Sequence, residues 1–108
     1  MSIKLAVLKS GETIISDVKE LISEEKICGY LFYKPHIVAL RTPILLTEEN
    51  SKEDLEVIMS PWINLTSDEK IPVPLEWVVT IVEPIKIINQ LYQEKINEKD
   101  DQVSFTEE

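Results

Sequence analysis

Few residues in this sequence carry well-defined chemistry. It has one cysteine, Cys28, and one histidine, His36, which are too few for a zinc site with four protein ligands. The acidic pairs Glu24-Glu25 and Asp100-Asp101 lie in a predicted turn and a predicted tail, where carboxylates are usually solvated. No sequence neighbour would activate the Cys28 thiol, so we expect it to be a small buried side chain. The sequence therefore predicts neither an enzyme nor a metal or other cofactor.

The segment Tyr33-Lys34-Pro35-His36 is the main candidate for a binding site. Tyr33 could stack on a nucleic-acid base of any sequence, with Lys34 and His36 near phosphate. The alternative is a strand bulge in which the histidine finds its hydrogen-bond partners within the protein. Trp62 and Trp77 could line a ligand groove, but large aromatic side chains more often pack in a core or a subunit interface.

The net charge disfavours nucleic acid as a partner. Eleven Lys and Arg residues and twenty Asp and Glu residues give a formal charge of −9, whereas phosphate binding draws most of its affinity from basic side chains. Residues 97–108 hold five acidic residues and one lysine, and their lack of apolar periodicity predicts a disordered tail. A basic protein partner suits such a chain better.

Length and hydropathy indicate one soluble domain. The 108 residues, 44% of them hydrophobic, suffice for a single compact core. No apolar run approaches the ~20 residues that cross a bilayer, and the first residues lack the pattern of a cleaved leader. We therefore expect a cytoplasmic protein without a membrane partner, and the lone cysteine is consistent with that reducing compartment.

Period-two patterns predict that most of the chain is β-strand. A strand at residues 4–9 meets the turn signal Ser10-Gly11, and a second strand follows at 13–21. A third strand over 27–40 should bend at Pro35, which has no amide hydrogen, and Gly29 suggests a bend or a close backbone approach. The later segments are a polar loop at 48–54, a strand at 55–59 and, at 71–75, a strand that Pro72 and Pro74 confine to an edge.

The end of the chain predicts one more strand and a helix. Residues 77–82 are nearly all apolar or β-branched, which predicts a strand buried on both faces, by its own sheet and by another element or subunit. Pro84 fits the first turn of a helix. About five strands and a helix suit a small barrel made from one bent sheet, although periodicity does not separate OB, SH3-like and Sm-like forms. The predicted apolar helix face is Ile85, Ile88, Leu91, Tyr92 and Ile96.

Several segments resemble the Sm-like family. LKSGETIISDV at 8–18 is similar to the opening of the first Sm motif, and GYLFYKPHIVAL at 29–40 is similar to its bent third strand. EWVVTIVEP at 76–84 is similar to the last strand of bacterial Hfq, which also closes with a proline. YLFYKPHIVAL and PWINLTSDEKIPVPLEWVVTIVEP most resemble Sm-like proteins of marine T4-like bacteriophages that infect cyanobacteria.

The resemblance, over residues 3–96, implies a small, strongly bent five-stranded Sm-like (SH3-type) barrel with a C-terminal α-helix. It implies a homo-oligomeric ring of six or seven subunits, in the host cell cytoplasm if a phage encodes the protein. The alternative is a structural or adaptor protein of a phage that binds a protein partner and not RNA, because Glu76 stands where the family places a base. The residues implied for RNA contact are Tyr33, Lys34 and His36, and those for the subunit interface are Trp77, Val78, Val79 and Ile81.

Overall fold

The computed structural model describes residues 1–41 and 56–97. It is mainly β with a helix after the last strand, as the sequence predicts. The predicted loop at 48–54 and the predicted tail beyond residue 97 lie outside the described residues. The elements are β1 (Ile3–Leu8), β2 (Thr13–Ser23), β3 (Lys26–Arg41), β4 (Glu56–Pro61), β5 (Lys70–Pro74), the 3-10 turn η2 (Leu75–Trp77), β6 (Val78–Val82) and α1 (Lys86–Ile96).

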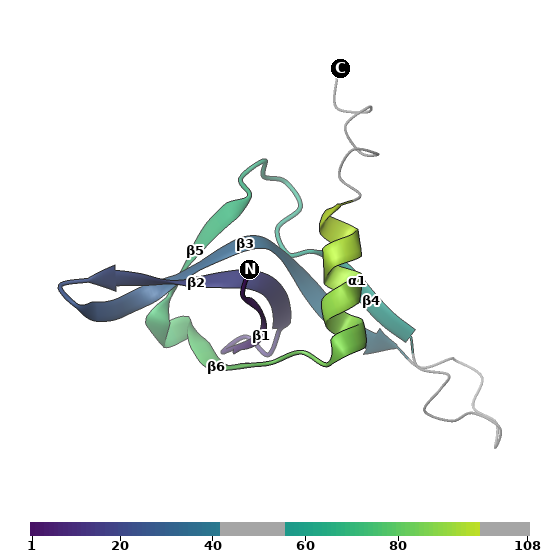
Figure 1. Cartoon of the computed structure of the whole chain (residues 1–108), viewed down its shortest axis with the longest axis horizontal. Helices are drawn as coiled ribbons and strands as arrows, with labels where there is room; N and C mark the ends of the chain where they lie inside the picture. The colour runs from purple at the N-terminus through teal and green to yellow at the C-terminus, as the bar shows by residue number, and fades with distance from the viewer. Residues whose placement is uncertain (42–55, 98–108) are drawn as a thin grey trace.

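The strands form one strongly curved antiparallel sheet (Figure 1). Its order is β4-β3-β2-β1-β6, and β5 lies beside the first half of β3. Residues 29–33 of β3 pair with β5, and residues 36–41 pair with β4. Within the described chain β6 pairs only with β1, so the sheet does not close. The predicted mainly β class is confirmed, but the described sheet has six strands, one more than the five of the predicted barrel, because β4 and β5 are separate strands that pair with different halves of β3.

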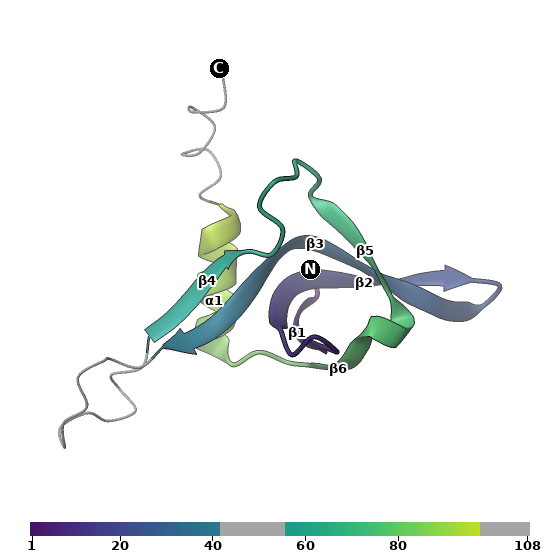
Figure 2. The same cartoon turned by 180° about the vertical axis from the view of Figure 1, so that it is seen from behind.

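The β2–β3 hairpin extends as an arm beyond the rest of the sheet (Figure 2). Its turn is Glu24-Glu25, with φ angles of 54° and 68°, as a two-residue turn between twisted strands requires. Cys28 is exposed on this arm, and its Sγ lies 3.3 Å from the Leu21 carbonyl oxygen. The prediction of a buried Cys28 is therefore wrong, since the arm extends past both hydrophobic cores.

β3 is the single bent strand that the sequence predicts. Lys34, directly before Pro35, has a φ of 48°, and the pairing of β2 with β3 shifts register between Ile15 and Asp17. Gly29 allows the predicted close approach, because a Cβ atom there would lie 2.9 Å from the Val73 carbonyl oxygen.

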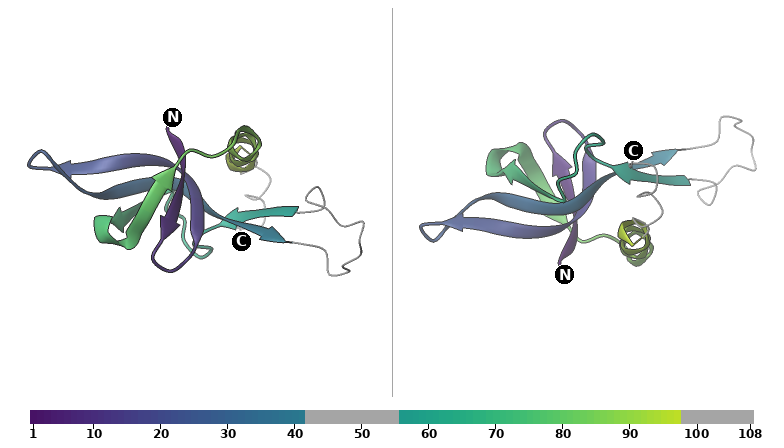
Figure 3. Two further views of the ribbon diagram at one scale, coloured as in Figure 1. Left: turned by 90° about the horizontal axis from the view of Figure 1, so that it is seen from below. Right: turned by 90° about the horizontal axis from the view of Figure 1, so that it is seen from above.

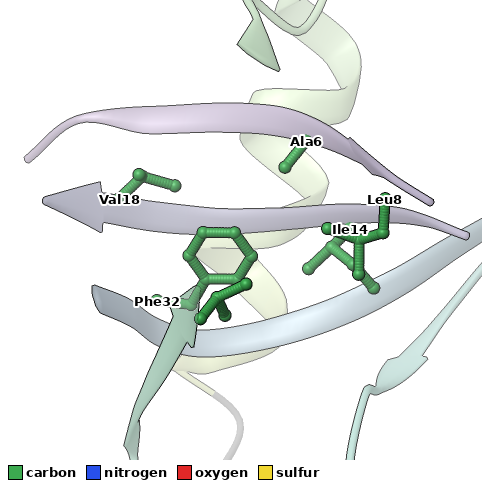
Figure 4. Close-up of a cluster of buried hydrophobic side chains, with 6 residues drawn as sticks. Ala6, Leu8, Ile14, Val18 and Phe32 are labelled. Carbon is green, nitrogen blue, oxygen red and sulfur yellow. The ribbon is translucent and has the colours of Figure 1, made fainter. Parts of the chain in front are cut away.

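Two hydrophobic cores lie on opposite faces of the sheet. The first, here called the inner core, is enclosed by the curve of the strands, and Figure 4 shows its buried side chains gathered together. Tyr30, Ile37, Trp62, Val78 and Ile81 pack around it. The buried members of the inner core are Ala6, Leu8, Ile14, Val18, Phe32 and Val73.

The second core, here called the outer core, lies between the sheet and α1, which runs along the outside of the curve (Figures 1 and 3). Ile88, Tyr92 and Ile96 face the sheet as predicted, and Leu91 is partly buried. Ile85 is 67% exposed, contrary to the prediction. It is the extended N-cap residue and Pro84 precedes it, so neither lies in the first turn of the helix.

The strand buried on both faces is β2, not the 77–82 segment. Residues 14–18 are all buried, because the inner core covers one face and α1 the other. β6 lies at the end of the sheet, outside the reach of α1, and its residues are half-buried or exposed. Trp77 belongs to η2 and not to the strand. No other element of the described chain completes this burial, so burial of the segment by a neighbouring subunit stays a prediction.

The Tyr92 hydroxyl joins α1 to the register shift of the sheet. It accepts a hydrogen bond from the Asp17 amide, at 3.2 Å, and donates one to the Tyr33 carbonyl, at 2.6 Å. The buried Ser16 hydroxyl donates to the same carbonyl, at 2.9 Å. Burial raises the pKa of Tyr92 to about 12. The side chain is fully buried, so its hydroxyl satisfies backbone groups that water cannot reach.

We expect Tyr92→Phe to lower the free energy of unfolding by about 1–3 kcal/mol, because the Asp17 amide would be buried without a partner. A group whose pKa is raised on folding stabilises the fold below its unfolded pKa, and that stability is lost as pH rises through the folded value. The difference in the free energy of unfolding between wild type and Tyr92→Phe should therefore have its full size below pH 10 and become smaller as the pH approaches 12. Denaturant titrations at several pH values measure it.

Tyr30→Phe is the control, because it removes a hydroxyl at the inner core instead of the register shift. A difference between wild type and Tyr92→Phe that does not change from pH 9 to about 12 would show that the phenol does not stabilise the fold in the way described.

Candidate functional site

The bulge at Tyr33-Lys34-Pro35-His36 lies where three segments meet. The Lys34 amide donates to the Glu69 carbonyl at 2.7 Å, and the Trp62 amide donates to the Pro35 carbonyl at 3.0 Å. These bonds anchor both ends of the β4–β5 connection to the bend of β3. The structure thus brings the predicted residues together with Glu69 of that connection.

The Lys34 ammonium group has partners within the protein. Its Nζ atom lies 5.4 Å from the centre of the Tyr33 ring and 4.0 Å from the Glu69 carboxylate. The side chain is 13% exposed. The charge is therefore partly compensated and has little access to solvent.

His36 is buried in the bend. Its Nδ1 atom lies 2.9 Å from the Lys34 carbonyl oxygen, which can only accept, so Nδ1 carries the proton. The ring meets the Tyr92 ring edge to face, with centroids 5.9 Å apart. Burial is the main cause that lowers the pKa of His36 below its usual 6.5, and the positive charges of Lys95 and Lys34 act in the same direction. This arrangement matches the alternative of a bulge with a satisfied histidine, and contact of His36 with RNA stays a prediction.

The tryptophans differ in their surroundings. Trp62 packs against the inner core, with its ring 6.2 Å from that of Phe32 and tilted by 46°. Its indole nitrogen donates to the Glu12 carboxylate at 3.3 Å. Trp77 is 41% exposed. Packing therefore accounts for Trp62, but not for Trp77 in a single chain.

The four residues predicted for the subunit interface point in two directions. Val78 and Ile81 pack against the inner core, whereas Trp77 and Val79 are exposed. Val79 is the extra residue of a bulge, since Val7 pairs with Thr80 and Leu8 with Val78. Val82 is also exposed but was not among the predicted interface residues. A bulge breaks the alternation from which the direction of each side chain is predicted.

The outer side of β6, here called the open edge, contrasts with that of β5. In an antiparallel pair, every second residue points its backbone N–H and C=O groups toward the neighbouring strand. The hydrogen bond from the Lys34 amide to the Glu69 carbonyl fixes which residues of β5 point toward β3. It places the nitrogens of Pro72 and Pro74 on the side away from β3, so the outer side of β5 has few donors. The open edge has no proline and no charged residue.

A second group of residues, of which the sequence predicts only Tyr33 as a site residue, lies on the outer face of the sheet. Tyr33 of β3 pairs with Asp17 of β2 on one side and with Lys70 of β5 on the other. Lys19 and Leu31 form the next pair on the same face. The five residues line a depression of about 190 Å³, here called the tyrosine hollow. No group of three or more potential metal ligands occurs among residues 1–41 and 56–97.

A larger depression, of about 240 Å³, lies on the other side of the bulge. Lys34, His36, Glu69 and Lys95 line it together with residues of β4. Its two lysines face one carboxylate and a histidine whose pKa is lowered.

None of the described helices is long and apolar enough to span a membrane.

Residues 1–97 match the model of a family described as a family of unknown function, DUF6561. No curated protein matches the sequence.

We expect acid to destabilise the fold through His36. A group whose pKa is lowered on folding contributes stability above its unfolded pKa, here 6.5, and that stability is lost as the pH falls. The free energy of unfolding of wild type relative to His36→Gln should therefore fall below pH 6.5, by at most about 1.4 kcal/mol per pH unit. Glutamine keeps a donor for the Lys34 carbonyl and does not titrate.

Urea titrations of both proteins between pH 7 and about 5 measure this difference, and NMR follows the imidazole itself. A His36 resonance that titrates at or above 6.5 would contradict the burial of the neutral ring.

Proposed function

The chain belongs to the DUF6561 family, whose function is unknown, and we propose that it is a non-enzymatic module that assembles with further copies of itself through the open edge of β6. The observation that carries this proposal is the composition and exposure of that edge. Val79 is 63% exposed and Val82 48% exposed, and Trp77 lies directly before the strand. An uncharged, apolar edge strand pairs readily with another strand unless something covers it.

A second copy of the chain is the occupant that fits this edge. The sheet ends in β6 on one side and in β4 on the other, and β4 also carries half-exposed apolar side chains, Val57 and Ile58. β5 is a poor partner because Pro72 and Pro74 remove donors from its outer side. Pairing of β6 with β4 of the next copy would use two different surfaces, and such contacts generate rings or filaments. The resemblance to Sm-like proteins favours a closed ring of six or seven copies.

The alternative functions that the sequence left open are RNA binding and a structural or adaptor role toward a protein partner. The partners of Lys34 and His36 within the chain favour the structural role for those two side chains. The net charge of −9 favours a basic protein as the further partner. These two arguments favour the alternative to RNA binding, a phage adaptor that forms a ring in the host cell and binds a protein partner.

Mass measurement by light scattering after size-exclusion chromatography tests the assembly. We expect wild type to elute as a complex of several copies and Val79→Lys to shift towards the 12.4 kDa of one chain, because a lysine on an edge strand opposes pairing. Val79 is a solvent-exposed bulge residue, so the variant should keep its fold and its circular dichroism spectrum.

Ile22→Lys is a matched control, since Ile22 is also on a strand and is 64% exposed, but lies on the hairpin arm. Wild type that stays at 12.4 kDa at high concentration would overturn the proposal. Equal dissociation of both variants would show that the open edge is not the contact.

A further inference from the structure

The acidity of the chain is concentrated in two segments outside the described fold. Residues 42–55 and 98–108 together hold nine of the twenty acidic residues and two of the eleven basic ones. The described residues 1–41 and 56–97 hold eleven acidic and nine basic residues, so this part of the chain is nearly neutral. Net charge is therefore a weak argument against an anionic ligand on that part of the chain.

The basic residues of the described part of the chain are not evenly spread. Lys19 and Lys70 are exposed and lie on the two strands that flank Tyr33 in the tyrosine hollow. Asp17 is the one carboxylate that lines the hollow. It is largely buried, and its Oδ1 accepts a hydrogen bond from the Ser2 amide at 2.9 Å. The hollow thus combines an aromatic ring with an excess of positive charge.

We propose that the tyrosine hollow binds a nucleotide unit, with the base on Tyr33 and the phosphate at one of the two flanking lysines, Lys19 or Lys70. Aromatic side chains on an open sheet face are general platforms for bases, because every base has a π-face. Lysines on either side supply charge for phosphate. The Asp17 carboxylate can only accept, so it fits the end of the ligand that carries sugar hydroxyl or base amino groups.

The site differs from the Tyr33, Lys34 and His36 set that the resemblance implies. It shares only Tyr33, and its two phosphate-binding lysines come from β2 and β5. His36 lies on the other side of the bulge, in the 240 Å³ depression. The proposal also stands apart from assembly, since none of the hollow residues belongs to β6.

Amide NMR spectra of the full chain, recorded with added ligands, test the proposal. The ligands are adenosine and uridine monophosphate, a six-nucleotide single-stranded RNA, ribose 5-phosphate and inorganic phosphate. We expect both monophosphates and the RNA to shift the resonances of Lys19, Tyr33 and Lys70, and to do so at lower concentration than the two ligands without a base. Tighter binding of RNA than of monophosphate would identify a strand as the source of the nucleotide, and equal binding per nucleotide would identify the free nucleotide.

Substitutions then assign the roles of the side chains. Lys19→Gln with Lys70→Gln should weaken binding about tenfold or more and reduce its salt dependence. Tyr33→Leu should weaken it roughly tenfold while leaving the backbone bonds of Tyr33 in place. Lys9→Gln with Lys26→Gln is the matched control, because both lysines are exposed and lie outside the hollow.

Three results would overturn the proposal. The first is that no nucleotide shifts the hollow resonances. The second is that inorganic phosphate shifts them as strongly as adenosine monophosphate, because the ring would then play no part. The third is that the control pair weakens binding as much as the Lys19 and Lys70 pair, because the attraction would then be general. The assembly state, measured on the same samples, reports separately on the open edge.

Discussion

The hydrogen bonds of the Tyr92 hydroxyl are the interaction on which the rest of the structure depends. The bend of β3 at Lys34 and the register shift of β2 leave backbone groups that cannot pair across the two strands. The phenol of α1 reaches two of them, the Asp17 amide and the Tyr33 carbonyl. A bent strand inside a double-faced core is stable only if such groups are satisfied. The helix is therefore a structural part of the sheet.

The same interaction determines which surfaces remain for function. α1 covers the outer face of the sheet beside the bulge, so the inner and outer cores together bury residues 14–18 of β2. It leaves uncovered the outer face further along β2, β3 and β5, where the tyrosine hollow lies. It also leaves Val79 and Val82 of β6, at the end of the sheet, exposed. The two proposed contacts thus use the two parts of the sheet that the helix does not reach.

Much of the fold could be predicted from local patterns. Segments with a period of two predicted the strands, and Pro35 predicted the bend of β3. Helical spacing predicted that Ile88, Tyr92 and Ile96 lie on the buried face of α1. What failed depends on tertiary position. An apolar run such as Val78–Val82 has the same sequence pattern whether the strand lies in the centre of a sheet or at its end. Only the strand order decides between these two positions. Cys28 is likewise exposed because a hairpin arm extends past the cores.

The candidate sites show the same limit. The sequence identified Tyr33, Lys34 and His36 because they are neighbours in the chain, and the structure shows two of them turned toward internal partners. Lys19, Tyr33 and Lys70 are far apart in the sequence and meet only through cross-strand register, which no local pattern predicts.

The two proposals reinforce each other physically. A shallow hollow of about 190 Å³ with two solvent-exposed lysines would hold a single nucleotide weakly. In a ring of identical copies the same hollow would recur at a fixed spacing. A flexible strand that engages one hollow would then meet the next at high effective concentration, so that weak sites act together. Assembly through β6 would in this way convert marginal nucleotide binding into stable binding of a strand, without any change to the hollow itself.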